Sequence, residues 1–210
     1  IHPTDPQIVY VTDNPSGMNK SYDGGRTWQH NNQGITARTR SYLEGLPLFS
    51  ATIDPGNPEI LWCGTQNTKG IFMSVDGGES WSRKDRGVEA GDEISFRGFG
   101  IHPANSDIVF GAAEIATEFQ GKEFNKTQGQ IFKTTDGGEN WYQVWDGNNL
   151  ARVVLFNYLH PDTVYWSTGI FDREAYDSDG DTQTRGGEGV LRSYDGGETW
   201  TNANTGIENL

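Results

Sequence analysis

One motif occurs four times in this chain and constrains its fold more than any other feature. Each copy reads Ser or Thr, any residue, Asp, Gly, Gly, two further residues and Trp. The copies begin at Ser21, Ser74, Thr134 and Ser193, and their aspartates are 53, 60 and 59 residues apart. A glycine follows six residues after every Trp. Self-similarity at a period of this size indicates a repeat architecture.

Each copy of the motif predicts a β-hairpin turn. The Asp carboxylate can accept hydrogen bonds from nearby backbone N–H groups, and the Ser or Thr hydroxyl can add a local bond. The two glycines supply the positive φ that tight hairpin loops need. The Trp opens the next strand and covers the hairpin with a large apolar surface. The residues expected to build these turns are Ser21, Asp23, Gly25, Trp28, Ser74, Asp76, Gly78, Trp81, Thr134, Asp136, Gly138, Trp141, Ser193, Asp195, Gly197 and Trp200.

A second element recurs in phase with the motif and completes a four-stranded unit. An Ile or Leu followed by His-Pro or Asp-Pro ends the first strand, and a short apolar run (8–10, 60–62, 108–110, 164–166) forms the second. The third strand carries the Ser or Thr of the motif, and the fourth starts near its Trp. Short strands at regular spacing, without helical periodicity, indicate an all-β protein. Four-stranded antiparallel units of this length predict the blades of a β-propeller.

The repeats predict a single array over residues 1–210, with four blades at approximately 1–35, 46–88, 93–147 and 151–207. Ile1 aligns with the last residue of a first strand, and few residues follow Gly206. We therefore expect the array to be incomplete at both ends, as a fragment of a larger propeller, because exposed sheet edges invite aggregation.

The Ser/Thr-x-Asp-x-Gly-x-x-Trp motif resembles the Asp-box, or bacterial neuraminidase repeat. The chain is thus similar to the Asp-box propellers, which include sialidases, xyloglucan-active endoglucanases, sortilin-type receptors and the photosystem II assembly factor of thylakoid lumens. The resemblance implies that Asp23, Asp76, Asp136 and Asp195 lie on the face away from any active site and are structural. It also implies an extracytoplasmic location, whether secreted, periplasmic or on the cell surface. It does not select an activity, because these relatives perform different functions on one scaffold.

Composition narrows the classes of partner. The formal net charge of −13 and the absence of a basic stripe argue against nucleic-acid binding. No apolar run reaches the length of a membrane span. Cys63 is the single cysteine and lies in an apolar run, where it is expected to be a small buried hydrophobic residue.

Variable connections predict which face carries function. In a propeller, the connections between second and third strands and between successive blades share one face. Here these connections vary, with long loops expected at 34–48, 114–130 and 171–189, and long loops on a rigid scaffold commonly carry binding sites. The candidate binding residues on this loop face are Arg40, Tyr42, Arg97, Glu118, Arg152, Asp172 and Arg173.

One acidic segment on this face predicts a metal site. Asp177, Asp179 and Asp181 alternate around a glycine, and Glu188 stands at the twelfth position counted from Asp177. This pattern partly matches an acidic Ca²⁺-binding loop, although the glycine falls at position four instead of six. The alternative is a solvated acidic loop without a metal.

No catalytic residue can be assigned from the sequence. Neither the arginine triad with a Tyr/Glu pair used by sialidases nor a paired-carboxylate motif can be recognised, and Glu114, Glu118, Asp172 and Glu174 are candidates for hydrolysis by position only. The main prediction is a non-catalytic binding or assembly module that engages a protein or glycan through the loop face. The alternatives are a glycoside hydrolase of the sialidase or xyloglucanase type, and a structural subunit of a larger complex.

Overall fold

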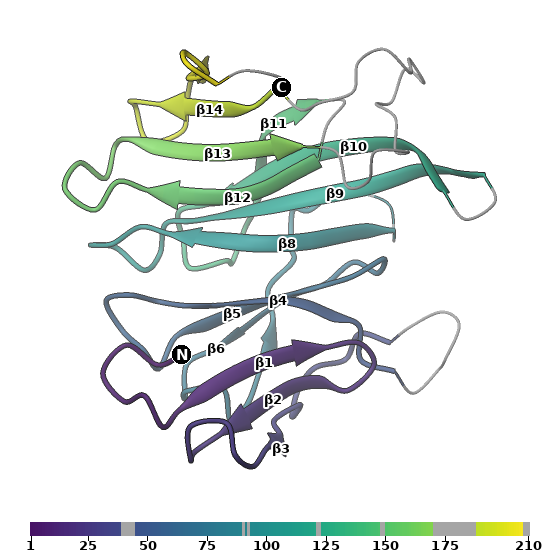
Figure 1. Cartoon of the computed structure of the whole chain (residues 1–210), viewed down its shortest axis with the longest axis vertical. Helices are drawn as coiled ribbons and strands as arrows, with labels where there is room; N and C mark the ends of the chain where they lie inside the picture. Colours follow the sequence, from purple (N-terminus) through teal and green to yellow (C-terminus); the bar gives the residue numbers. More distant parts are fainter. Residues whose placement is uncertain are drawn as a thin grey trace.

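The computed structural model describes residues 1–38, 45–89, 91, 93–120, 123–147, 150–169 and 188–207. These residues form β-strands arranged in four antiparallel sheets and contain no helix, which confirms the all-β prediction (Figure 1). In each sheet the strands follow one another in chain order, so every connection within a sheet is a hairpin. None of the described residues forms a helix able to span a membrane.

The first sheet has three described strands, β1 (Val9–Asp13), β2 (Gly17–Ser21) and β3 (Gln29–His30). The second sheet has four, β4 (Leu48–Ile53), β5 (Leu61–Thr65), β6 (Ile71–Ser74) and β7 (Ser82–Arg83). Every residue of β5 is buried, because this strand lies inside its own sheet and is covered on both faces by neighbouring sheets.

The third sheet contains β8 (Ile94–Ile101), β9 (Val109–Gln120), β10 (Glu123–Thr134) and β11 (Tyr142–Gly147). The loop expected at 114–130 is wrong, because β9 and β10 pair as antiparallel strands over most of this segment, with register shifts on either side of Lys126. Backbone pairing there overrides a composition rich in Glu, Lys, Thr and Gln that is typical of loops.

The fourth sheet contains β12 (Leu150–Phe156), β13 (Val164–Gly169), β14 (Val190–Ser193) and β15 (Thr201–Asn202). Most of the expected 171–189 loop lies outside the described residues. Tyr165 pairs with Arg192, as Tyr10 pairs with Lys20 in the first sheet. Tyr165, and not Trp166, is therefore the counterpart of Tyr10.

Successive sheets pack face to face around three apolar clusters. Trp62, Phe96 and Phe132 are at most 1% exposed between the second and third sheets, and Phe110 and Trp166 are equally buried between the third and fourth. The first strands β4, β8 and β12 contact one another in sequence. They start on the same side of the molecule, to the right in Figure 1, towards which the β9–β10 hairpin also extends.

Candidate functional site

In each of the four motif turns, the Asp carboxylate accepts hydrogen bonds from residues of the same turn. In the second copy, Asp76 Oδ1 accepts the Ser80 N–H at 2.9 Å, and Asp76 Oδ2 accepts the Ser80 hydroxyl at 2.5 Å. The Ser74 hydroxyl donates to Asp76 at 2.7 Å and accepts the Gly78 N–H at 2.8 Å. The same pattern recurs in the other three copies, except that in the third the Asn140 side-chain amide replaces the hydroxyl as donor to Asp136 Oδ2. These bonds hold the turn and engage both carboxylate oxygens of its Asp.

These hydrogen bonds also keep the motif carboxylates ionised. The Thr27 hydroxyl and N–H lower the pKa of Asp23 to about 2, and the Asn140 side chain and N–H lower that of Asp136 to about 2. Bonds from Ser193 and Thr199 lower the pKa of Asp195 further. At Asp76 partial burial opposes ionisation, but the Ser80 bonds outweigh it and the pKa is still lowered. Hydrogen bonds donated to a carboxylate stabilise its charged form, so the ionised Asp and its donors hold the turn together.

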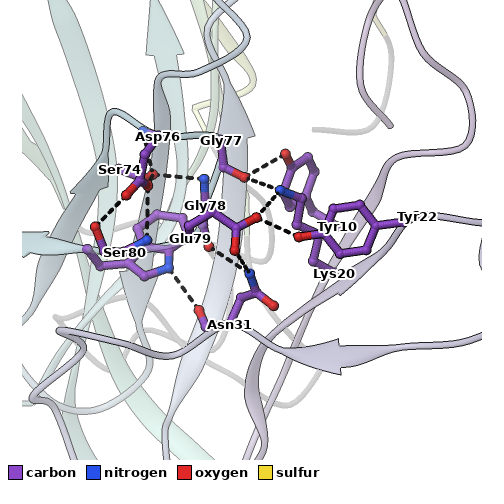
Figure 2. A network of polar contacts seen from close by, with 11 residues as sticks. Tyr10, Lys20, Tyr22, Asn31, Ser74, Asp76, Gly77, Gly78, Glu79 and Ser80 are labelled. Carbon is purple, nitrogen blue, oxygen red and sulfur yellow. Dashed lines mark hydrogen bonds and ion pairs between the residues drawn. The ribbon is translucent and has the colours of Figure 1, made fainter.

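The second, third and fourth motif turns also contact the preceding sheet. Figure 2 shows Lys20 of the first sheet donating to the Gly77 carbonyl at 2.8 Å and to Glu79 at 2.6 Å, while the Tyr22 hydroxyl donates to the same carboxylate at 2.5 Å. The Trp81 indole N–H donates to the Asn31 carbonyl at 2.9 Å. The motif side of the molecule therefore joins one sheet to the next.

A different set of residues gathers where the first strands begin. The register of β4 shifts between Leu48 and Ser50, which leaves Phe49 as an extra residue opposite β5. Equivalent shifts leave Arg97 as the extra residue of β8 and Arg152 as that of β12. Each of these β-bulges lies within the first four residues of its strand. Bulges re-aim side chains and are over-represented beside active sites.

The bulged side chains and Glu114 form what we call the central cluster: Phe49, Arg97, Glu114 and Arg152. The Arg97 guanidinium lies 4.3 Å from the centroid of the Phe49 ring. Nε and Nη2 of Arg97 donate to the two carboxylate oxygens of Glu114 on β9, and both side chains are 13% exposed. The Ser50 hydroxyl beside Phe49 donates to the Phe96 carbonyl at 3.0 Å and thereby ties the bulge of β4 to that of β8.

Arg152 brings a second positive charge to the central cluster. Burial lowers the pKa of Arg152, the like charge of Arg97 lowers it further, and Glu114 opposes this change. Arg97 and Arg152 thus bring two guanidinium groups close to the Glu114 carboxylate. Such an arrangement favours a ligand that presents several hydrogen-bond acceptors, since guanidinium groups bind oxygen pairs in a fixed fork.

The structure brings together only part of the predicted binding set. Arg97 and Arg152 lie in the central cluster, whereas Glu118 lies on β9 in a segment where only the backbone is described. Glu188 is described, and its carbonyl accepts a hydrogen bond from the Asn204 amide at 2.6 Å. The other predicted binding and metal residues lie outside the described residues: Arg40, Tyr42, Asp172, Arg173, Asp177, Asp179 and Asp181.

Sequence reasoning missed Phe49 and treated Glu114 as a positional candidate. A signal for the cluster was available in the repeat alignment, because Phe49, Arg97 and Arg152 all lie near the start of a first strand. Without the register, however, nothing distinguishes a bulged residue from its neighbours.

Comparison with known proteins supports the propeller fold. No protein-family model matches the chain. Xyloglucanase Xgh74A of Acetivibrio thermocellus is 24% identical in an alignment that covers 95% of this chain and 31% of that protein. An ancestral GH74 enzyme superposes with a TM-score of 0.66 at 21% identity, covering 95% of this chain and 23% of the enzyme. The GH74 xyloglucanase from Xanthomonas campestris superposes with a TM-score of 0.64 at 15% identity, covering 96% of this chain and 29% of that one.

These likenesses define the class of fold: the four sheets are blades of a β-propeller. Within that class, the chain is similar to xyloglucanases and spans 31% of the length of the curated relatives it matches.

Proposed function

We propose that the chain is an Asp-box propeller segment that binds a β-glucan polysaccharide of the xyloglucan type through the central cluster. The observation that carries this proposal is the set of three equivalent bulges, which bring Phe49, Arg97 and Arg152 to the start of neighbouring first strands. The likeness to xyloglucanases supports the choice of ligand class.

The chemistry of the cluster suits a polyhydroxylated ligand. A sugar ring offers hydroxyl oxygens that can accept from guanidinium N–H groups, and its C–H face can contact an aromatic ring. We place the ligand beside Arg152, whose side chain is only partly buried. Arg97 is held by Glu114 and Phe49, which fixes its orientation before the ligand arrives. An extracytoplasmic location is part of the proposal, since a polysaccharide of this kind is met outside the cytoplasm.

Binding is favoured over hydrolysis for the described residues. Glycoside hydrolysis needs two carboxyl groups, one of which must donate a proton to the leaving oxygen. The central cluster contains one carboxylate, and both of its oxygens accept from Arg97. The hydrolase alternative keeps support from the likeness to xyloglucanases. On that alternative this segment supplies substrate contacts, and the acid–base pair comes from other residues of the complete enzyme.

The test measures xyloglucan binding by affinity gel electrophoresis and isothermal titration calorimetry. Arg152→Gln should weaken binding by about tenfold or more, because a charge-assisted hydrogen bond contributes about 1.5–3 kcal/mol. Arg83→Gln, which changes an arginine of strand β7, a strand that carries no residue of the central cluster, is the matched control and should bind as the unaltered chain does. Equal binding by both variants, or no binding to xyloglucan at all, would remove the ligand assignment.

A separate assay tests the absence of catalysis. Incubation of the chain with xyloglucan should release no new reducing ends. Steady release that is lost in Glu114→Gln would overturn the binding-only assignment while leaving the substrate class intact.

A further inference from the structure

The joints between successive sheets follow one steric rule. A Cβ built on Gly78, the second glycine of its motif, would lie 3.1 Å from the Tyr10 ring of the preceding sheet. The corresponding Cβ on Gly138 would lie 2.5 Å from Trp62, and that on Gly197 would lie 2.4 Å from Phe110. In each case an aromatic ring on β1, β5 or β9 of the preceding sheet fills the space that a side chain would need. This explains why the second motif glycine has no side chain.

The joints also follow an electrostatic rule. The residue after that glycine is Glu79, Glu139 or Glu198, and each pairs with a lysine of the preceding sheet. Lys20 on β2 and Lys133 on β10 occupy equivalent positions, each one residue before the Ser or Thr of its motif, and their side chains are only 6% and 8% exposed. In the second sheet this position is held by Met73 on β6. The positive charge comes instead from Lys84, which directly follows β7.

A third contact closes two of the joints. A Cβ on Gly34 would lie 1.9 Å from the Trp81 carbonyl oxygen, and one on Gly87 would lie 2.2 Å from that of Trp141. The two indoles are 5% and 3% exposed. At the third joint Gly147 differs, because it is the last residue of β11 and does not have a positive φ.

The outer face of the fourth sheet carries an aromatic residue and a basic residue equivalent to those with which the first sheet contacts the motif turn of the second. Tyr165 pairs with Arg192 as Tyr10 pairs with Lys20. Arg192 lies 4.4 Å from the Tyr194 ring centroid, as Lys20 lies 4.7 Å from that of Tyr22. Among the described residues, the buried Nε of Arg192 has no hydrogen-bond partner.

The glycine of this face repeats the same conformation. Gly206 has a φ of +85°, close to the +90° of Gly34 and the +87° of Gly87. A Cβ on Gly206 would meet no atom of the described residues within 4 Å, so none of them fills the space that the next Trp carbonyl fills in two other joints. On the same sheet, Tyr194 is 62% exposed, and Ile207, which follows Gly206, is 46% exposed.

From these features we infer that the outer face of the fourth sheet docks a further blade of the same motif, one that presents Gly, then a carboxylate, then Trp two positions later. The carboxylate pairs with Arg192, the glycine lies on Tyr165 and the Trp carbonyl fills the space at Gly206. A second copy of this chain is a poor occupant, because its first motif has Arg26 at the carboxylate position. Two guanidinium groups would then face each other, which disfavours the contact.

A charge reversal at Arg26 tests this inference. Arg26 is exposed on its turn, so Arg26→Glu should fold normally while giving the first sheet the missing carboxylate. We expect the variant to associate head to tail, with a dissociation constant in sedimentation velocity at least about tenfold lower than that of the unaltered chain. Adding Arg192→Glu should return association to the original level.

Arg83→Glu makes the same change of charge on β7 and serves as the control, with no gain in association expected. The inference is overturned if Arg26→Glu associates no more strongly than the unaltered chain or this control. It is also overturned if Arg26→Glu/Arg192→Glu still associates, because the contact would then lie elsewhere. Far-ultraviolet circular dichroism checks that each variant is folded.

Discussion

At the scale of single residues, the same amino acid serves differently according to the sheet that precedes it. Trp28 is 42% exposed, whereas Trp81 is 5% exposed and donates its indole N–H to the Asn31 carbonyl of the first sheet. The local turn around each Trp is the same, so the difference comes from packing between sheets. Large buried aromatic side chains dominate the energetics of such contacts.

This difference predicts unequal costs of truncation. Trp81→Ala should lower the free energy of unfolding by about 3–5 kcal/mol, because it removes a buried aromatic side chain and leaves a cavity. Trp28→Ala, the matched change in the first motif, should cost about 1 kcal/mol, because much of that ring is already in water. Urea denaturation followed by circular dichroism measures both. Equal losses would show that packing between sheets adds little to the local turn.

The motif carboxylates predict acid sensitivity. The pKa of Asp136 is about 2 in the fold, against an ordinary value of 3.8. Above about pH 5 this group is ionised in both states and its hydrogen bonds contribute fully; as the pH falls towards 2, the unfolded chain binds protons first and stability is lost. Denaturation curves at pH 6, 4, 3 and 2 should show this decline. Asp136→Asn should be less stable at pH 6 and should decline less steeply, and a steeper decline in the variant would contradict the assignment.

At the scale of elements, the sequence predicts the tight turns between strands better than it predicts which residues of the strands pair. The motif places all four turns because its Asp, Gly and hydroxyl groups act within a few residues. The sequence predicts a loop where the β9–β10 hairpin lies, because these strands are largely polar and only their mutual pairing reveals them. Tyr165 and Trp166 are adjacent aromatics, so alternation alone cannot tell which one pairs with Arg192.

The candidate site shows the same limit. Arg97 and Arg152 were placed on the loop face because they lie near variable connections. Their meeting with Phe49 depends on three bulges, each of which moves one residue out of register. A one-residue shift leaves the local pattern of apolar residues almost unchanged, while it redirects the side chain.

A Ca²⁺ site in the acidic segment at 177–188 remains a prediction from the sequence. Three carboxylates within five residues repel one another unless a cation screens them, and Ca²⁺ takes oxygen ligands at about 2.3–2.6 Å. Millimolar Ca²⁺ should raise the melting temperature by mass action, and calorimetry should detect binding that Asp179→Asn weakens. Magnesium, which prefers stricter geometry, is the control. Absence of both heat and thermal shift in Ca²⁺ would favour the solvated acidic loop.

At the scale of the whole molecule, stability is distributed between neighbours along the array. Each sheet buries its apolar residues against the next, in clusters that join the first sheet to the second, the second to the third, and the third to the fourth. Arrays built in this way behave approximately as a sum of repeat stabilities and nearest-neighbour contacts. Local stability should therefore rise where a sheet has neighbours on both faces and fall where it has one.

Hydrogen exchange can measure this gradient. All five residues of β5 are buried, whereas β1 has none fully buried and exposes two of its five residues. Openings that expose the β1–β2 hairpin should therefore cost roughly 2 kcal/mol less than those that expose β5–β6, and β1 amides should exchange first. Mass spectrometry of peptides covering the two hairpins, compared under conditions where both are native, provides the test. Exchange of both hairpins at one common free energy would instead mean that the four sheets unfold as a single cooperative unit, with the contacts between sheets stronger than the sheets themselves.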